Sequence, residues 1–392
     1  MALPLSFLQP RLLVDHCPAC FGTLQTELLY RQCSVPVQSC LLPESGEQAR
    51  RLPQRAIELL ECRQCGLIFN RCFDPYSQRF DPGYEETQEF SPVFQRFSRE
   101  LCALLAERWT LARSTVLEVG CGKGDFLARL CHHHHCRGIG IDPAYDPARR
   151  PPLASQAVQY QCRSFDRADA GLRADYLICR HVLEHIGPIH EFLDTIAEVA
   201  KVGGVREVFF EVPDAGRILA EGAFWDIYYE HANYFSAEAL EQAFIRAGFE
   251  VTGTLALFNQ QYLGLFARPA QHGHSAPSLT VDGAPTDHLA ENLSRWRQIL
   301  AAAEKPIVIW GSGSKGVAFL HAADPERQVL AAVDINPFRQ GRFMPGSGQS
   351  IIAPEDLVQL APQTVVIMNP AYRDEIQAQL QGLGLQPQLL GV

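Results

Sequence analysis

The stretch that decides the fold runs from residue 117 to residue 127 and reads Leu117-Glu118-Val119-Gly120-Cys121-Gly122-Lys123-Gly124-Asp125-Phe126-Leu127. Its first residues are typical of a buried strand, and its last residues are typical of the first turn of a helix. The three glycines between them lack a Cβ, so the chain can turn sharply and bring its backbone close to a ligand. The stretch therefore predicts a strand, a glycine loop and a helix around a bound molecule.

Acidic residues lie at the ends of two neighbouring predicted strands. Glu118 ends the first strand just before the glycine loop, and Asp142 ends the next strand. Because parallel strands end at the same edge of a sheet, Asp142 is placed to accept hydrogen bonds from ribose hydroxyls. This layout resembles the first motif of class I S-adenosylmethionine (SAM) methyltransferases, E/D-x-G-x-G-x-G, and the matching residues are Glu118, Gly120, Gly122 and Gly124. The resemblance implies that these residues and Asp142 bind SAM.

A nicotinamide cofactor is the nearest alternative ligand for this loop. Nicotinamide sites normally have the pattern G-x-G-x-x-G, with a helix start that cradles a phosphate. SAM has no phosphate, and an acid ahead of the first glycine suits its positively charged methionine end. A loop without a ligand is less well supported, because the two acids and three glycines all fall where the cofactor needs them.

Composition and charge narrow the class of protein. The chain has 392 residues, of which 47% are hydrophobic and 20% are charged, as in a globular protein of two or three domains. Its net charge of −10 disfavours nucleic acid or an anionic membrane as the main partner. No apolar run is long enough to span a bilayer, and residues 1–10 lack the features of a secretion signal. We therefore expect a cytoplasmic monomer or weak homodimer that acts on a small molecule.

The cysteines suggest a metal site. All 13 lie between Cys17 and Cys179, and two pairs have the spacing of a zinc knuckle, Cys17-x-x-Cys20 and Cys62-x-x-Cys65. In a knuckle, a tight turn holds two thiolates at about 2.3 Å from the ion. Four thiolates leave no open coordination position, so the zinc would be structural. A redox-active pair is the alternative; it is disfavoured because two pairs occur and neither lies between a strand and a helix.

Predicted strands and helices alternate along most of the chain. The predicted strands of the first unit are 115–119, 138–142, 174–179, 207–212, 251–257 and 259–268, and its predicted helices are 86–110, 124–131 and 190–202. A Pro- and Gly-rich linker, 269–286, and a helix, 287–303, precede a second unit with strands 306–310, 329–334 and 364–368, a glycine loop at 311–316 and a helix at 317–322. This alternation is typical of doubly wound parallel sheets.

A second group of titratable residues lies among aromatic side chains at 224–236. It follows the predicted strand 207–212, and in an open α/β sheet the loops at this end of the strands line the ligand crevice. Glu230 and His231 can supply an orienting carboxylate and a base, and tyrosines such as Tyr228 can stabilise an oxyanion. From the chemistry alone, a half-buried loop with aromatic packing and surface charge explains these residues equally well.

The order of these features resembles a family of three-domain, zinc-containing, SAM-dependent C-methyltransferases that act on nucleotide-linked ketosugars. The resemblance covers nearly the whole chain. Its most specific matches are the cysteine quartet, the run Tyr228-Tyr229-Glu230-His231 with Tyr234-Phe235-Ser236, and residues 334–346. It implies catalytic roles for Tyr228, Glu230, His231 and Tyr84. A further resemblance to class I methyltransferases places His181 in the SAM pocket, and the family resemblance places Ser312, Ser314 and Lys315 near an anionic substrate group.

We therefore expect an α/β protein in which a class I methyltransferase Rossmann-like domain, 86–270, lies between an N-terminal zinc-binding domain, 1–85, and a C-terminal Rossmann-like α/β substrate-side domain, 285–392. The expected reaction is SAM-dependent methylation of a carbon next to a ketone, on a nucleotide-linked deoxyketosugar. His231 would remove the proton, Glu230 would orient or charge the imidazole, and Tyr228 would steady the enolate oxygen or the substrate.

Three alternatives stay open at this point. The first is an O- or N-methyltransferase that acts on another small metabolite. The second is an NAD-using enzyme built on the glycine loop 311–316, whose pattern resembles a dinucleotide fingerprint. The third is a SAM- or zinc-binding scaffold without catalytic activity, in which Glu230 and His231 would have no catalytic role.

Overall fold

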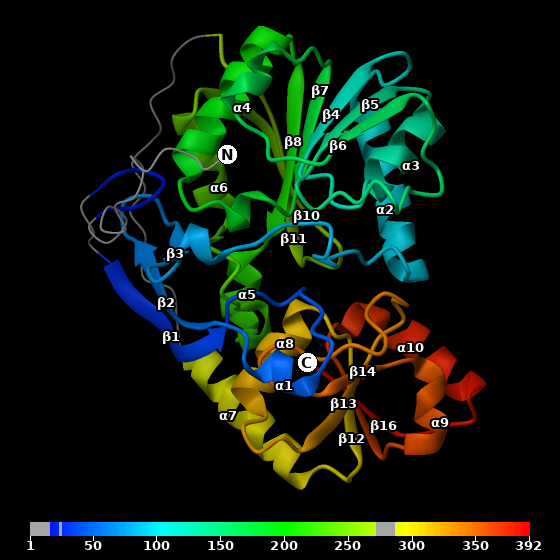
Figure 1. Cartoon of the computed structure of the whole chain (residues 1–392). Coiled ribbons are helices and arrows are strands. Elements are labelled where there is room, and N and C mark those ends of the chain that lie inside the picture. Colours follow the sequence, from blue (N-terminus) through cyan, green and yellow to red (C-terminus); the bar gives the residue numbers. More distant parts are fainter. Residues whose placement is uncertain (1–15, 23–25, 272–286) are drawn as a thin grey trace.

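Three β-sheets organise the chain (Figure 1). The computed structural model describes residues 16–22, 26–271 and 287–392. Residues 1–10 and most of the predicted linker 269–286 lie outside this described part. Among the helices that are described, none is both long enough and apolar enough to cross a membrane.

The central sheet has seven strands in the order β10-β11-β8-β7-β4-β5-β6. The strands are β4 (Thr115–Val119), β5 (Arg137–Ile141), β6 (Val158–Gln161), β7 (Tyr176–Arg180), β8 (Glu207–Pro213), β10 (Phe249–Leu257) and β11 (Tyr262–Pro269). The five strands from β8 to β6 are parallel, whereas β11 pairs antiparallel with both β8 and β10. The chain runs outward from β4 in one direction and from β7 in the other. The two strands therefore flank a topological switch point, where open α/β sheets bind ligands.

Helices cover both faces of this sheet (Figure 1). They are α2 (Pro92–Arg108), α3 (Asp125–His134), α4 (Ile189–Gly203) and α6 (Ala237–Arg246). Helix α5 (Ala215–Glu221) lies below the sheet, toward the C-terminal unit. The predicted helix 86–110 is wrong at its start, because α2 begins only at Pro92. Ser91 caps the helix by accepting a hydrogen bond from the Phe94 amide, and proline suits the first helical position. Residues 86–91 are thereby free to line a cavity.

The N-terminal sheet includes one strand, β9, from a distant part of the sequence. Its order is β1-β2-β3-β9, with β1 (Thr26–Pro36), β2 (Gln54–Cys62), β3 (Ile68–Asn70) and β9 (Asn233–Tyr234), and a short helix, α1 (Gly46–Arg50), follows β1. In β9, Tyr234 pairs with Ile68 and Asn233 pairs with Phe69. Since β9 directly follows His231, the N-terminal sheet holds the segment that the sequence marks as catalytic.

The C-terminal sheet is fully parallel, as the alternation of elements predicts. Its order is β14-β13-β12-β15-β16, with β12 (Ile307–Trp310), β13 (Val329–Val333), β14 (Ser350–Ile352), β15 (Thr364–Ile367) and β16 (Gln388–Gly391). The helices of this unit are α7 (Asp287–Ala302), α8 (Ser314–Ala323), α9 (Leu357–Leu360) and α10 (Arg373–Gly382). One apolar core joins the three parts: its buried members include Ile57 and Leu59 of β2, Phe224 and Trp225 before the catalytic segment, and Phe319 of α8.

Gly316 offers a test of how closely α8 packs on the strand before it. A Cβ added at Gly316 would overlap the carbonyl oxygen of Gly311, which is backbone and cannot rotate away. We expect Gly316→Ala to lower the free energy of unfolding by about 1–3 kcal/mol, because overpacking forces the backbone to shift. Thermal denaturation followed by circular dichroism measures the change.

Gly382→Ala is the matched control in the same unit. Gly382 ends α10, and no described atom lies within 4 Å of the position that its Cβ would take. Alanine has the higher helix propensity, so this variant should keep or slightly raise the melting temperature. An unchanged melting temperature for Gly316→Ala would contradict the close packing of α8.

Candidate active site

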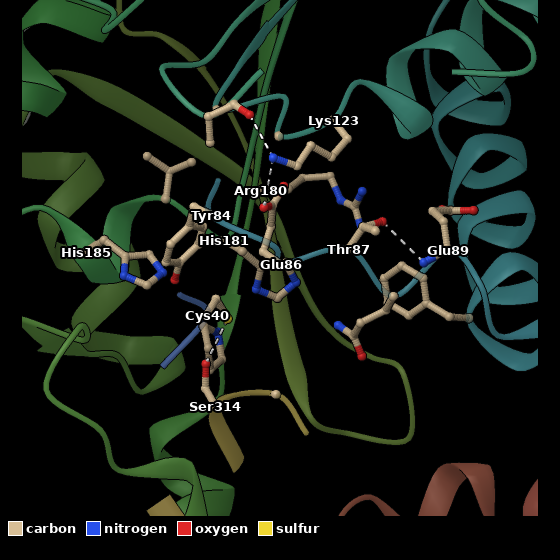
Figure 2. Close-up of a pocket in the computed structure, with 18 of the residues that line it drawn as sticks. Cys40, Tyr84, Glu86, Thr87, Glu89, Lys123, Arg180, His181, His185 and Ser314 are labelled. Carbon is tan, nitrogen blue, oxygen red and sulfur yellow. Dashed lines mark hydrogen bonds and ion pairs between the residues drawn. The ribbon is translucent and has the colours of Figure 1, made fainter. Parts of the chain in front are cut away.

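A cavity of about 580 Å³ lies where the three parts of the chain meet. Its wall includes Tyr84 and Glu86 from the segment before α2, the glycine loop after β4, and Lys315 from the C-terminal unit. Figure 2 shows Tyr84, Glu86 and other lining residues around it. Sites for cofactors and small substrates typically have this size.

The glycine loop has the backbone shape that its sequence requires. Gly120, Gly122 and Gly124 have φ values of 74°, 53° and 87°, which side chains with a Cβ rarely adopt. At Gly120 an added Cβ would also overlap Val182, which follows β7. All three glycines are needed for the loop to follow the path between β4 and α3.

The two predicted cofactor acids lie beside this loop and line the cavity. Asp142 accepts hydrogen bonds from the amides of Gly122 at 2.8 Å and Ala144 at 2.6 Å, so it shapes the loop as well as facing the ligand. Glu118 is buried, and burial raises its pKa to about 8. A cation bound nearby would favour its ionised form.

Tyr160 braces the glycine loop from β6, a strand that the sequence did not predict. Its hydroxyl donates to the carbonyl oxygen of Gly124 at 2.8 Å, and its ring stacks on Tyr145 with centroids 4.6 Å apart. A tyrosine in a short strand carries no local signal for this role, because only the fold brings β6 beside the loop.

His181 lies in the wall of the cavity as a cation. Its Nε2 is 2.8 Å from Glu211 Oε1, and its Nδ1 is 3.4 Å from Glu184 Oε1. Burial alone would lower the pKa of His181, but its interactions with Glu184 and Glu211 outweigh burial and raise the pKa to about 9. Its φ of 52° places it in the left-handed region. The predicted pocket residue therefore lines the cavity with a charge and is poorly suited to accept a proton.

The four predicted catalytic residues come together beside the cavity. The Tyr84 hydroxyl donates to Glu230 Oε1 at 2.8 Å, and both side chains are buried. The rings of Tyr228 and His231 have centroids 4.1 Å apart. The sequence expectation had Glu230 orienting the imidazole, whereas in the structure the hydrogen bond of this carboxylate goes to Tyr84.

His231 differs from His181 in its charge. Burial holds the pKa of His231 well below the ordinary value, and electrostatic interactions with His185, His181 and Lys315 lower it further. Its Nδ1 is buried and has no hydrogen-bond partner among the described residues. His231 is therefore a neutral imidazole, which has one unprotonated ring nitrogen to accept a proton.

His185 is a cavity residue that sequence reasoning underrated. His185 and Glu184 lie in a short 3₁₀ turn, Leu183–His185, and both line the cavity. The Nδ1 of His185 is 2.9 Å from the carbonyl oxygen of Glu230, and its ring centroid is 4.9 Å from that of His231. Glu184, His185 and His231 each offer a ligand atom within 4.8 Å of the others, close enough to hold a metal ion.

The cysteine quartet forms a compact cluster beside the N-terminal sheet. The Sγ atoms of Cys17 and Cys65 are 3.6 Å apart, as are those of Cys20 and Cys62, and all four lie within 4.8 Å of one another. A tetrahedral zinc ion with Zn–S distances of about 2.3 Å separates its sulfur atoms by about 3.8 Å. The donor set and its spacing therefore fit zinc.

The C-terminal unit contributes charged groups to the cavity wall. Lys315 Nζ lies 2.9 Å from Asp226 Oδ1 and 3.0 Å from Gln261 Oε1, and Arg217 pairs with the same aspartate. Ser314 also lines the cavity, whereas Ser312 is buried and donates to Asp334. Of the three residues expected near an anionic group, Ser314 and Lys315 are therefore in position.

Comparisons with known proteins match two parts of the chain. The "Methyltransferase domain" family matches residues 93–254, and the "C-methyltransferase C-terminal domain" family matches residues 284–386. The chain is a SAM-dependent methyltransferase. The predicted class I methyltransferase fold of its central part is thereby confirmed.

Individual relatives share part of this methyltransferase's sequence. The "C-methyltransferase NovU" of Streptomyces niveus is 25% identical over 360 residues, which cover 82% of this chain and 81% of NovU. A "Probable S-adenosylmethionine-dependent methyltransferase" of Mycolicibacterium smegmatis is 30% identical over 179 residues, or 44% of this chain and 65% of that protein. Among solved structures, the chain is similar to the magnesium protoporphyrin IX methyltransferase of Synechocystis with bound SAH, with 18% identity and a TM-score of 0.37. The aligned part covers 48% of this chain and 91% of that protein.

Asp142 allows a direct test of the cofactor end of the cavity. An asparagine at this position can accept only one of the two backbone hydrogen bonds and turns an N–H₂ group toward the other amide. We expect Asp142→Asn to weaken SAM binding by about 10- to 100-fold, as for the loss of a hydrogen bond to a charged group. Isothermal titration calorimetry with SAM measures the change.

Asp146→Asn is the control in the same loop. Asp146 accepts one hydrogen bond, from the Ala148 amide, and asparagine keeps that acceptor. This variant should bind SAM as the unchanged protein does. Full affinity in Asp142→Asn would show that SAM does not occupy the glycine loop in the way that the sequence motif implies.

Proposed function

We propose that this enzyme methylates a carbon next to a ketone, on a nucleotide-linked deoxyketosugar, through an enolate. The observation that carries the proposal is a neutral, buried His231 in ring contact with Tyr228, in the cavity that also contains the glycine loop. The match of the C-terminal part to a C-methyltransferase domain and the similarity to C-methyltransferase NovU support carbon as the nucleophile.

A carbon next to a ketone must lose a proton before it can attack. His231 accepts this proton on its imidazole, and the electrons of the C–H bond move onto the ketone oxygen. Burial raises the pKa of Tyr228 well above its usual value, so the hydroxyl stays protonated and can donate to the oxygen of the enolate. The carbon then takes the methyl group that bound SAM supplies.

Tyr84 and Glu230 act as a positioning pair in this proposal. Burial, together with the charges of Cys40 and Glu230, raises the pKa of Tyr84 well above its usual value, so Tyr84 remains the donor in its hydrogen bond to Glu230. The carbonyl oxygen of Glu230 also lies against His185 Nδ1. The pair thus fixes the backbone that precedes His231 and the neighbouring ring.

Cationic side chains in the cavity wall support an anionic substrate. Lys315 and Arg339 of the C-terminal unit line the cavity, as does Arg217 of α5, which shares Asp226 with Lys315. Guanidinium and ammonium groups are the usual partners of phosphate oxygens. We therefore assign the nucleotide part of the substrate to the 285–392 unit, the methyl transfer to the 86–270 unit and the zinc to the 1–85 unit.

The reaction is tested with SAM and a panel of 4-ketosugar nucleotides, and the products are analysed by mass spectrometry and NMR. We expect the new methyl group on carbon. In D₂O without SAM, we expect the proton on that carbon to exchange, because deprotonation precedes transfer. His231→Asn should lower both exchange and kcat by at least about 100-fold, the usual contribution of a general base.

Tyr228→Phe and Tyr229→Phe form a matched pair of variants for the same assay. Tyr228 lines the cavity, whereas the Tyr229 hydroxyl donates to the carbonyl oxygen of Cys72, away from it. Only Tyr228→Phe should lower kcat. Transfer to carbon at the full rate in His231→Asn would exclude the base assignment, and a product methylated on oxygen or nitrogen would support the alternative activity.

We also propose that the cysteine quartet holds one structural zinc ion. Cys62→Ser should lose the zinc and lower the melting temperature, because the ion links the turn at 17–20 to the end of β2. Metal analysis by mass spectrometry measures the stoichiometry. Cys72→Ser is the control, since Cys72 is half-buried in the same unit but stands outside the quartet.

The metal content separates the two possible ion sites. One zinc ion per chain that disappears in Cys62→Ser would support the quartet. A zinc content that survives Cys62→Ser would contradict it and point to Glu184, His185 and His231. Thiolate ligands of this kind require reducing conditions, which agrees with the cytoplasm as the site of action.

A further inference from the structure

Glu86 is a half-buried acid beside the glycine loop that the sequence motif does not include. A Cβ at Gly122 would lie 2.5 Å from Glu86 Oε1, so this carboxylate occupies the space that the second glycine leaves open. The residue lines the cavity (Figure 2). It belongs to the segment before α2 and therefore reaches the cofactor end of the cavity from outside the central sheet.

The cation next to Glu86 balances its charge only in part. Lys123 Nζ is 3.9 Å from Glu86 Oε2, too far for a hydrogen bond, and donates instead to the carbonyl oxygens of Ala144 at 2.8 Å and Pro82 at 3.1 Å. Within the described part of the chain, Glu86 Oε2 is buried without a hydrogen-bond partner. Burial raises the pKa of this carboxyl to about 7, against the opposing effect of Lys123.

The residues on its N-terminal side already have partners. Tyr84 donates to Glu230, and Glu85 accepts a hydrogen bond from Asn336 Nδ2 at 2.8 Å and pairs with Arg149. Three consecutive side chains thus reach the catalytic segment, the C-terminal unit and the glycine loop. Of the three, Glu86 is the one that carries an incompletely balanced charge into the cavity.

We propose that Glu86 binds a positively charged group of SAM, as a second carboxylate besides Glu118. SAM has two such groups, the α-ammonium and the sulfonium, and a cation stabilises a carboxylate whose buried oxygen has no hydrogen-bond partner. Glu118 approaches from the end of β4, and Glu86 approaches over Gly122 from the segment before α2. The N-terminal part of the chain thereby contributes directly to cofactor binding.

The affinities of three ligands for the Glu86→Gln variant, measured by calorimetry, test this assignment. We expect SAM to bind about 10- to 100-fold more weakly, because glutamine keeps the shape but removes the charge. 5′-Methylthioadenosine has neither cation and should bind with unchanged affinity. S-adenosylhomocysteine (SAH) has the ammonium but not the sulfonium, so an equal loss for SAH assigns Glu86 to the ammonium, and a loss confined to SAM assigns it to the sulfonium.

Glu107→Gln is the matched control. Glu107 is an exposed carboxylate near the end of α2, and its variant should bind all three ligands normally. Unchanged SAM affinity in Glu86→Gln, or an equal loss for methylthioadenosine, would overturn the proposal. Loss of SAM binding in Asp142→Asn with full binding in Glu86→Gln would keep the cofactor at the glycine loop and reject only the role of Glu86.

Discussion

The hydrogen bond from Tyr84 to Glu230 joins two buried side chains that are 146 residues apart in the sequence. A buried carboxylate without a partner is costly, so this bond holds the segment before α2 against the catalytic segment. The neighbours of Tyr84 extend the same connection: Glu85 reaches Asn336 of the C-terminal unit, and Lys123 of the glycine loop holds the carbonyl oxygen of Pro82. The cavity exists in its present form because this one segment is tied to all of its walls.

The N-terminal sheet positions the catalytic segment in a second way. Strand β9 begins two residues after His231 and completes that sheet through its pairing with β3. The aromatic residues before the segment belong to the apolar core that also includes strand β2 and helix α8. The segment is thus held at its C-terminal end by a strand pair and at its N-terminal end by the core.

Local patterns in the sequence were enough to predict the cofactor end of the site. Strand β4 has the predicted bounds, and the glycines and Asp142 meet because strand ends in a parallel sheet share one edge. The start of α2 and the 3₁₀ turn at His185 were missed, since a serine cap and a short turn override the apolar periodicity. Tyr160 and Glu86 gave no local signal at all: their roles arise from contacts with the glycine loop across distant parts of the chain.

The two histidines of the cavity show how the fold separates charge states over a short distance. His181 has two carboxylates beside it and is held protonated, whereas His231 is buried and is held neutral. The difference depends on the surroundings of each ring, because Glu184 and Glu211 contact His181, whereas burial dominates at His231. The hydrogen bond of Glu230 goes to Tyr84. Groups whose pKa values are pushed apart in this way take different roles in acid–base chemistry, and the neutral member of the pair is the one suited to accept a proton.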